Sequence, residues 1–319
     1  MSILIMQPLP TNAVDWLRAQ GEDVLLAYED DGWRARAGEI RALIYHSIPI
    51  DRPLMDALPA LEVIGKRGAG IDTIDLDEAR ARGLRITNVG AGGNAVAVTE
   101  HAIMLLLAAT RSVVARDAAT RQGCFATRFD MPLVNEITGS RIGIVGAGHI
   151  GTRIAAVCRD GFGCEIGYYD PYLDETQASA RGGRLFASVD ALFAWADNGI
   201  IAAPRTPQST GMIGTAQLEA LGREGALVII SRGGIVDEPA LVKALRTGRI
   251  RAAGVDVYAS EPPPDDHPFF ALDNIVLTPH VAGGTTKSHE RTSLMVCQQV
   301  HALLHGGDAP VVDDQPWLA

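Results

Sequence analysis

Cysteines and runs of basic residues are scarce in this chain. Its 319 residues include four cysteines, none in a Cys-x-x-Cys pair or near clustered histidines. This pattern predicts neither a disulfide framework nor a zinc site, and we expect no metal. The longest Lys/Arg run is the Lys66-Arg67 pair, and the formal net charge is −10. Because binding to a phosphate backbone needs a basic face, a nucleic-acid partner is not expected.

Long apolar runs are also missing. The N-terminal segment 1–6 lacks a positively charged flank and meets Pro8 too early for a secretion signal, so we predict a first strand there. No run approaches the roughly 18 apolar residues that cross a bilayer, which excludes an evident membrane span. The longest candidate, Ala102–Ala109, is predicted to be a buried helix. We therefore expect a cytoplasmic protein with reduced thiols and no membrane partner.

What the chain does contain is two series of short apolar runs alternating with helical or turn segments, the pattern of parallel α/β sheets. The first series predicts strands at 3–6, 24–27, 42–45, 61–65 and 84–87. The second predicts strands at 141–145, 165–169, 199–203, 226–230, 252–257 and 275–278. Long helices are expected at about 98–117 and 285–305. The fold class predicted is α/β, with two doubly wound parallel-sheet domains.

The most specific motif is a Gly-x-Gly-x-x-Gly turn between the run 141–145 and a helical pattern. Gly146 permits a tight turn, Gly148 lets backbone N–H groups approach a pyrophosphate, and Gly151 lets the helix pack on the strand. Asp170 ends the next apolar run, where its carboxylate would accept hydrogen bonds from ribose hydroxyls and repel a 2′-phosphate. Since residues 171–173 contain no compensating arginine, the motif predicts NAD rather than NADP.

The position of this motif also bears on the domain organisation. It begins only after a complete α/β series, so we predict a Rossmann NAD-binding domain, residues 98–285, inserted into a flavodoxin-like substrate domain, residues 1–97 and 286–319. Ligands of open α/β sheets bind at the carboxyl ends of the strands. A small substrate is therefore expected in a cleft between two such units.

Three further motifs accompany the glycine turn: Ile229–Asp237, Gly254–Val257 followed by Glu261-Pro262-Pro263, and Leu277–Gly284. With them, the chain resembles the D-isomer-specific 2-hydroxyacid dehydrogenase family over nearly its whole length. It resembles the short, hydroxypyruvate/glyoxylate reductase-like members, which have no regulatory domain. The resemblance implies that Arg232, Glu261 and His280 are the catalytic residues.

Each of these three residues suits hydride transfer between a 2-oxoacid and a D-2-hydroxy acid. An imidazole can take up or release a proton near neutral pH, so His280 would be acid in reduction and base in oxidation. A neighbouring carboxylate, Glu261, would favour the imidazolium and fix its tautomer. The planar fork of Arg232 would hold the substrate carboxylate and polarise the carbonyl.

The residues expected to bind cofactor and substrate lie in these motifs and after the early strands. The cofactor set is Gly146, Gly148, His149, Ile150, Gly151, Asp170, Pro204, Thr206, Ser231, Asp256 and Gly283. For the substrate, Ala69 and Gly70 resemble the family loop whose amides hold a carboxylate, and Tyr45 and His46 follow the third strand. Arg205 stands where the family usually has an apolar residue, and its role is open. The remaining histidines, His301 and His305 among them, are assigned to surface or core.

Several alternatives stay open at this point. Phosphoglycerate-specific members tend to carry arginines after the third strand, where Tyr45-His46-Ser47 stands, so hydroxypyruvate or glyoxylate is favoured over a D-3-phosphoglycerate dehydrogenase-like reaction. Formate dehydrogenases have glutamine at the position of Glu261, which argues against that activity. From another class, the transcriptional corepressors of this family bind NAD and keep the same three residues. A homodimer is expected through the helix at about 98–117 and the following arm to residue 140.

Overall fold

The computed structural model describes residues 2–127 and 129–312, and the chain divides into two units. One unit combines Met1–Asn94 with Gly284–Ala319, and the other is Ala95–Gly283. These divisions lie a few residues from the predicted boundaries at 97/98 and 285/286. Residues 313–319, assigned above to the substrate domain, lie outside the described residues. The roles assigned to the two units stay predictions.

The discontinuous unit is built on a five-stranded parallel sheet in the order β2-β1-β3-β4-β5. Its strands are β1 (Ser2–Ile5), β2 (Asp23–Leu26), β3 (Ile40–Tyr45), β4 (Val63–Lys66) and β5 (Arg85–Asn88). This is the flavodoxin-like order, which confirms the predicted fold class. The side chains of β1 alternate between two apolar cores because successive residues point to opposite faces.

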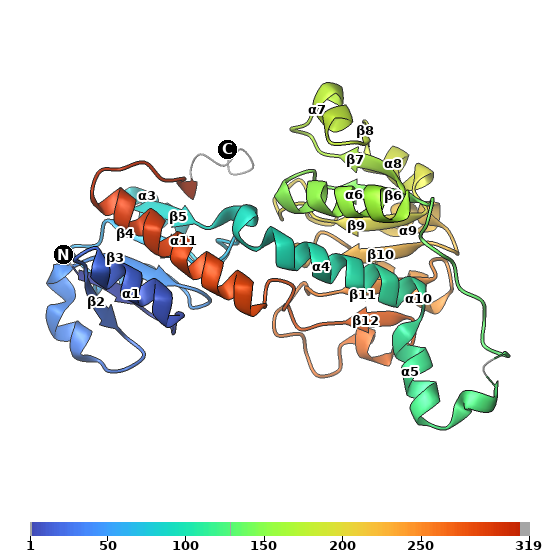
Figure 1. Cartoon of the computed structure of the whole chain (residues 1–319), viewed down its shortest axis with the longest axis horizontal. Coiled ribbons are helices and arrows are strands. Elements are labelled where there is room, and N and C mark those ends of the chain that lie inside the picture. The colour runs from blue at the N-terminus through green and yellow to red at the C-terminus, as the bar shows by residue number, and fades with distance from the viewer. Residues whose placement is uncertain (1, 128, 313–319) are drawn as a thin grey trace. The chain divides into compact units, whose positions relative to one another are not determined.

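Helices cover both faces of this sheet. On one face lie α1 (Thr11–Ala19) and α11 (Thr286–Leu304), side by side in Figure 1. The other core is closed by α2 (Arg52–Asp56), α3 (Leu76–Ala81) and the 3-10 helix η1 (Gly32–Glu39). The N-terminal and C-terminal segments of the chain therefore pack on the same face of one sheet.

The Ala95–Gly283 unit is built on a seven-stranded parallel sheet in the order β12-β11-β10-β9-β6-β7-β8. Its strands are β6 (Arg141–Val145), β7 (Glu165–Tyr169), β8 (Arg184–Leu185), β9 (Asn198–Ile201), β10 (Ala226–Ile229), β11 (Ala252–Val255) and β12 (Ile275–Leu277). Two-residue β8 was not predicted, since so short a run carries no periodicity. The order reverses at β6, as in a Rossmann sheet.

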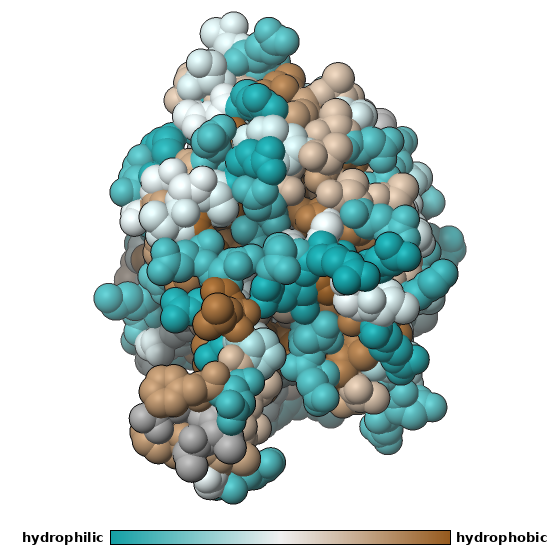
Figure 2. All heavy atoms as spheres, turned by 90° about the vertical axis from the view of Figure 1, so that its right-hand side faces the viewer, coloured by the Kyte–Doolittle hydropathy of each residue, from teal (hydrophilic) through white to brown (hydrophobic). Residues whose placement is uncertain are grey.

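Helices again pack on both faces of the seven-stranded sheet. One core includes residues of α6 (His149–Phe162) and α7 (Glu175–Ala180), and the other includes residues of α8 (Val189–Trp195), α9 (Thr215–Leu221) and α10 (Glu238–Arg246). The 3-10 helix η3 (Pro268–Ala271) adds Phe269 to the second core. Figure 2 shows one side of the molecule, where hydrophilic side chains predominate and apolar patches are small.

The helix predicted at 98–117 is wrong at both ends. Helix α4 runs over Gly90–Thr110, and a separate helix α5 (Val113–Arg121) follows, then the 3-10 helix η2 (Cys124–Thr127). Glycine-rich residues 90–93 have low helix propensity, which hid the start. Ser112 has a φ of 49°, in the left-handed region, and this conformation separates the two helices. The segment Gly92–Thr110 is long and apolar enough to cross a membrane, but half of it is buried inside the structure, as in a core helix.

Candidate active site

The predicted catalytic and cofactor residues of the Ala95–Gly283 unit all follow carboxyl ends of its parallel strands. In chain order they follow β6, β7, β9, β10, β11 and β12. Because all these strands run parallel, their carboxyl ends form one edge of the sheet. The glycine turn follows β6, the strand at which the order reverses. Residues spread over more than 130 positions of sequence therefore share the edge where ligands of such sheets bind.

The glycine turn has the geometry of a dinucleotide cradle. Gly146 has a φ of 94°, and a Cβ there would lie 2.6 Å from the backbone nitrogen of Ala203. A Cβ on Gly151 would lie 2.0 Å from the carbonyl oxygen of Gly146. At Gly148, in contrast, a Cβ would meet no described atom within 4 Å. Nothing within the described chain therefore requires glycine at Gly148, whereas a pyrophosphate approaching the N-terminus of α6 would.

Asp170 ties the end of β7 to the glycine turn. Its Oδ2 accepts a hydrogen bond from the N–H of Ala147 at 2.8 Å, and its Oδ1 accepts one from the N–H of Tyr172 at 2.9 Å. The Arg181 side chain, from the end of α7, donates from Nη1 to the carbonyl oxygen of Ala147 at 2.5 Å. No sequence pattern points to Arg181, because it is 34 residues from Ala147 along the chain.

The loops after β9 and β10 contain three further predicted cofactor positions, Pro204, Thr206 and Ser231. Ser209 braces the β9 loop, because its Oγ donates to the carbonyl oxygen of Pro204 at 2.8 Å and accepts from the N–H of Thr206 at 2.8 Å. The Oγ of Ser231 is buried and has no hydrogen-bond partner within the described ranges. A buried hydroxyl without a partner costs free energy, so it fits a position that a polar ligand group completes.

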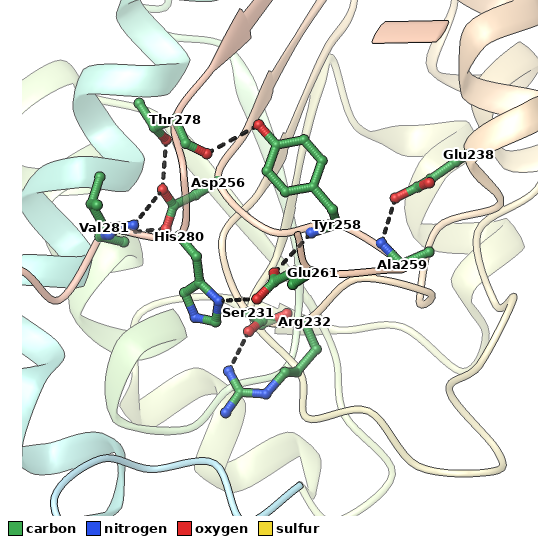
Figure 3. Close-up of polar contacts among 11 residues, drawn as sticks. Ser231, Arg232, Glu238, Asp256, Tyr258, Ala259, Glu261, Thr278, His280 and Val281 are labelled. Carbon is green, nitrogen blue, oxygen red and sulfur yellow. Dashed lines mark hydrogen bonds and ion pairs between the residues drawn. The ribbon is translucent and has the colours of Figure 1, made fainter. Parts of the chain in front are cut away.

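The predicted catalytic pair is formed in the structure. His280 Nδ1 and Glu261 Oε2 are 2.6 Å apart, with side chains 45% and 37% exposed (Figure 3). Glu261 is itself held, because its Oε1 accepts the N–H of Tyr258 at 3.0 Å. The Tyr258 hydroxyl donates to the carbonyl oxygen of Thr278 at 3.1 Å. The carboxylate thus takes one nitrogen of the imidazole and orients the other.

Asp256 organises the loop that carries His280. It is fully buried, and its Oδ1 accepts from the Thr278 hydroxyl at 2.6 Å and from the N–H of Val281 at 2.9 Å, while its Oδ2 accepts the N–H of Ala282 at 2.9 Å. Burial alone would raise the pKa of Asp256, but hydrogen bonds from His101, Thr278 and the two backbone N–H groups outweigh it and lower that pKa. These bonds identify a structural function for Asp256, whereas its assignment to the cofactor set stays a prediction.

The backbone of His280 is itself unusual. Its φ is 54°, and among described non-glycine residues only Ser112 shares a positive φ. The left-handed region costs a non-glycine residue about 1 kcal/mol or more, so surrounding bonds must hold it. The N–H of His280 donates to the carbonyl oxygen of Asp256 at 2.7 Å, and the next two N–H groups bind the Asp256 carboxylate. The strained conformation places the imidazole beside Glu261.

Arg232 lies in the same region as the imidazole. Its Nη1 donates to the carbonyl oxygen of Ser231 at 2.6 Å, and Figure 3 shows its guanidinium group gathered with His280 and Glu261. Arg205 approaches the neighbouring loop, since a Cβ on Gly234 would lie 3.6 Å from its Cδ. The three residues that the resemblance assigned to catalysis are therefore brought together from the ends of β10, β11 and β12.

A second histidine–carboxylate pair supports the loop of Glu261. Glu238 accepts the N–H of Ala259 at 2.7 Å through Oε1, and its Oε2 is 3.2 Å from His267 Nε2. These two side chains are 15% and 10% exposed, and the His267 ring packs against Phe269. The sequence assigned His267 only to surface or core, because nothing in its local pattern distinguishes a loop anchor from any other histidine.

The predicted substrate residues of the discontinuous unit fall into two groups. Tyr45 is 1% exposed within an apolar core, its hydroxyl lies 3.4 Å from Thr73 Oγ1, and burial raises its pKa. The structure thus corrects its assignment as a cleft residue, since the ring ends β3 inside the core. His46 is exposed, and its N–H donates to the Gln7 side chain at 2.9 Å.

The loop after β4 contains the other group. The carbonyl oxygen of Ala69 accepts from Asn88 Nδ2 at 2.8 Å, which fixes the loop that continues into Gly70. Arg67 is 8% exposed, and its Nε and Nη1 have no hydrogen-bond partner in the described part of the chain. Burial lowers its pKa, and His289 nearby has its own pKa lowered by burial and by the Arg67 charge. Unsatisfied buried guanidinium nitrogens fit an anion-binding position.

Comparison with known proteins adds sequence relatives and a solved structure. Residues 103–282 match a family model described as D-isomer specific 2-hydroxyacid dehydrogenase, NAD binding domain. The chain is 31% identical to a D-3-phosphoglycerate dehydrogenase from Archaeoglobus fulgidus over 96% of its own length but only 58% of that relative. It is 35% identical to a glyoxylate reductase from Korarchaeum cryptofilum, covering 84% of this chain and 80% of the relative. It is also similar to an NADPH-dependent glyoxylate/hydroxypyruvate reductase from Sinorhizobium meliloti, with a TM-score of 0.84, 27% identity and 99% coverage of both chains.

Proposed function

This chain belongs to the D-isomer specific 2-hydroxyacid dehydrogenase family, and we propose that it reduces a small 2-oxoacid to the D-2-hydroxy acid with a reduced nicotinamide dinucleotide. The observation that carries the proposal is the His280–Glu261 pair at 2.6 Å, beside Arg232. Residues of the glycine turn would hold the pyrophosphate of this dinucleotide, whose nicotinamide would supply the hydride for C2 of the substrate. The residues of the chain then have to bind the acid and deliver one proton to its carbonyl oxygen.

The side chains divide this work. Arg232 binds the substrate carboxylate and polarises the carbonyl, because its charge is permanent and its fork matches two oxygens. His280 gives the proton from Nε2, since Nδ1 faces Glu261. Glu261 stabilises the protonated ring and keeps its tautomer. In the oxidative direction the same imidazole accepts the hydroxyl proton.

The direct test is the oxidation of NADH by purified protein with a panel of 2-oxoacids, among them glyoxylate, hydroxypyruvate and pyruvate. We expect turnover with at least one of them and formation of the D-hydroxy acid. Tight NADH binding without turnover on any acid would contradict the proposal. It would instead favour the corepressor-like alternative, in which the cofactor controls binding of another protein.

For the cofactor we propose NAD. Both carboxylate oxygens of Asp170 accept backbone N–H groups at the end of β7, and the negative charge of this carboxylate would repel a 2′-phosphate. Arg181 is the nearby cation that could offset this charge. We expect NADH to bind at least about tenfold more tightly than NADPH, and Asp170→Ala to narrow the difference. Equal affinity of the unaltered protein for both cofactors would overturn this part of the proposal.

For the substrate we propose a 2-oxoacid with an uncharged tail, such as glyoxylate or hydroxypyruvate, because His46 stands after β3 where arginines would favour a phosphate. A phosphoglycerate-type substrate remains the second candidate, since the buried Arg67 presents unsatisfied guanidinium nitrogens. Comparing kcat/KM for hydroxypyruvate and its 3-phosphate, in the unaltered protein and in Arg67→Ala, separates the two. A preference for the phosphate that disappears in Arg67→Ala would establish the second candidate.

We also propose a cytoplasmic homodimer. The four cysteines are all unpaired in the described structure, as suits a reducing compartment. An apolar groove of about 710 Å³ on α4 and α5 is lined by Ile103, Met104, Leu107 and Val113, among others. Met104 and Val113 are 41% and 49% exposed, which is typical of a surface that another copy covers. A monomer by sedimentation at micromolar concentration would contradict the dimer.

A further inference from the structure

We propose that Glu22, His301 and His305 form a binding site for one divalent transition-metal ion of the Zn²⁺ type. These residues lie in the discontinuous unit, apart from every residue assigned to catalysis. His301 Nδ1 is 2.6 Å and His305 Nε2 is 2.8 Å from the same oxygen, Glu22 Oε1. The three candidate ligand atoms all lie within 4.8 Å of one another. Two imidazoles and one carboxylate are a donor set that Zn²⁺ favours in proteins.

The local structure explains how the three side chains meet. His301 lies in the last turn of α11, and His305 caps its end, so their i, i+4 spacing puts both rings on one side of the helix. The ring centroids are 4.5 Å apart. At the end of α1, Gly21 has a φ of 83°, and this turn brings Glu22 against α11. The Trp16 ring contacts His301 edge-on, with centroids 5.5 Å apart, and limits its rotation.

The burial of the site favours a cation. The Glu22 side chain is only 4% exposed, whereas those of His301 and His305 are 25% and 45% exposed. A buried carboxylate needs compensation, and the carbonyl ends of two helices, α1 and α11, add negative potential at the same place. The more exposed His305 leaves the ion accessible to water, which would complete a tetrahedral shell. Arg41 is close enough to interact electrostatically with Glu22, but its side chain donates a hydrogen bond to Glu62 instead.

Small adjustments convert the hydrogen-bonded cluster into a metal site. In a tetrahedral zinc site with bonds of about 2.0–2.1 Å, neighbouring ligand atoms lie roughly 3.3 Å apart. The observed 2.6 and 2.8 Å separations would therefore have to open by about 0.5 to 0.7 Å, within the reach of side-chain rotations.

The expected consequence is a clip between distant parts of the chain. Glu22 and His301 are separated by 279 residues, and the whole Ala95–Gly283 unit is inserted between them. A cross-link that closes a long loop restricts the unfolded chain strongly. Bound metal would therefore stabilise the discontinuous unit by joining its N-terminal and C-terminal segments, without taking part in hydride transfer.

Untagged, chelator-treated full-length protein tests the proposal with Zn²⁺ alone as the probe. Zinc stoichiometry is measured by equilibrium dialysis, and the geometry by the visible absorption of Co²⁺ bound in place of Zn²⁺. We expect one tight equivalent per chain and a tetrahedral Co²⁺ spectrum. Glu22→Gln and His305→Asn should weaken this binding at least about tenfold, since even outer-shell changes have effects of that size. His289→Asn, on the same helix but outside the cluster, is the matched control and should bind zinc normally.

Melting temperatures provide the second measurement. Zn²⁺ should raise the Tm of the unaltered protein and of His289→Asn, and leave the Tm of Glu22→Gln unchanged. A folded Glu22→Gln that binds the same tight equivalent would overturn the proposal. The proposal would also be overturned if Glu22→Gln lowered the Tm by the same amount with and without zinc. The cluster would then stabilise the protein only through its hydrogen bonds.

Discussion

Two histidine–carboxylate clusters in this protein have the same short contact but opposite surroundings. His280 Nδ1 meets Glu261, and His301 Nδ1 meets Glu22, each at 2.6 Å. The Glu261 side chain is 37% exposed and faces one imidazole, while that of Glu22 is 4% exposed and faces two. The first arrangement leaves an accessible ring that can exchange a proton. The second gathers three donors around a buried charge and suits a metal ion better than proton transfer.

The comparison shows that the contact itself does not define a function. A third pair, His267 with Glu238, is nearly buried on both sides and only anchors a loop. What differs is whether the imidazole reaches solvent, how many rings share the carboxylate, and whether the backbone is strained. His280 combines exposure with a positive φ, and strained residues of this kind cluster at functional sites.

The largest effect is expected from breaking the exposed pair. His280→Ala removes the proton donor, so kcat for 2-oxoacid reduction should fall by about 10² to 10⁴-fold. NADH affinity should change little, since the glycine turn is untouched. Steady-state kinetics and a fluorescence titration of NADH measure the two quantities. Glu22→Gln is the matched variant from the buried cluster, and it should keep kcat; an equal loss in both variants would erase the distinction.

The His280–Glu261 pair can also be disturbed indirectly, through Asp256, which holds the loop of His280. Asp256→Asn weakens the bonds that hold the His280 loop, and we expect a loss of about 2–4 kcal/mol in the free energy of unfolding. The pKa of Asp256 is lowered in the folded state, so its stabilisation is present above the ordinary value of 3.8 and is lost as pH falls through the lowered one. The stability difference between the two proteins should therefore narrow below about pH 3.8, as urea titrations at several pH values would reveal. A gap that widened in acid would contradict this account.

A milder change sharpens the role of Glu261. Glu261→Gln keeps the size of the side chain and one oxygen that can accept a hydrogen bond. It cannot accept hydrogen bonds from both the Tyr258 N–H and the His280 ring, and it lacks the negative charge that supports the imidazolium. We expect kcat to fall by about 10 to 100-fold with little change in stability. Glu238→Gln in the loop-anchoring pair is the control, and should lower Tm more than kcat. A larger loss of kcat in Glu238→Gln, together with a larger loss of Tm in Glu261→Gln, would contradict the roles given to these two carboxylates.

The smallest effect is expected in the metal-free buried cluster. Glu22→Gln in chelator-treated protein should lose about 1–2 kcal/mol of unfolding free energy, because one amide oxygen still accepts a hydrogen bond. Chemical denaturation measures this value, and adding Zn²⁺ should widen the gap. If the difference in unfolding free energy between the unaltered protein and Glu22→Gln stayed constant over the zinc titration, the Glu22 cluster would have no role in metal binding that distinguishes it from the His280–Glu261 pair.

Much of the fold was predictable because local patterns carried it. Except for β8, the described strands of both sheets were predicted within a few residues, since buried parallel strands are short apolar runs between turns. The start of α4 was not predicted, because the glycines at 90–93 oppose helix formation and only tertiary packing overcomes their low helix propensity. The cofactor turn was predictable because glycine at fixed spacing has a direct steric cause.

The site was predictable where a motif named the residue and not elsewhere. Arg232, Glu261 and His280 stand in motifs, whereas Arg181, His267 and the Glu22 cluster meet their partners only across long sequence separations. The i, i+4 spacing of His301 and His305 was visible, but the carboxylate that completes the set comes from the other end of the chain. Tyr45 was misplaced because a residue ending a strand can point to either face.

The sequence by itself determined the α/β architecture and the glycine turn, and its motifs point to the residues that we propose for proton transfer. These depend on local periodicity and on side-chain chemistry that no other residue supplies. The tertiary structure alone decided which carboxylate meets which histidine, how deeply each pair is buried, and that Asp256 holds the His280 loop. Burial and pairing depend on contacts between segments far apart in the chain, and those contacts decide whether the same imidazole moves a proton, anchors a loop or offers a nitrogen to a metal.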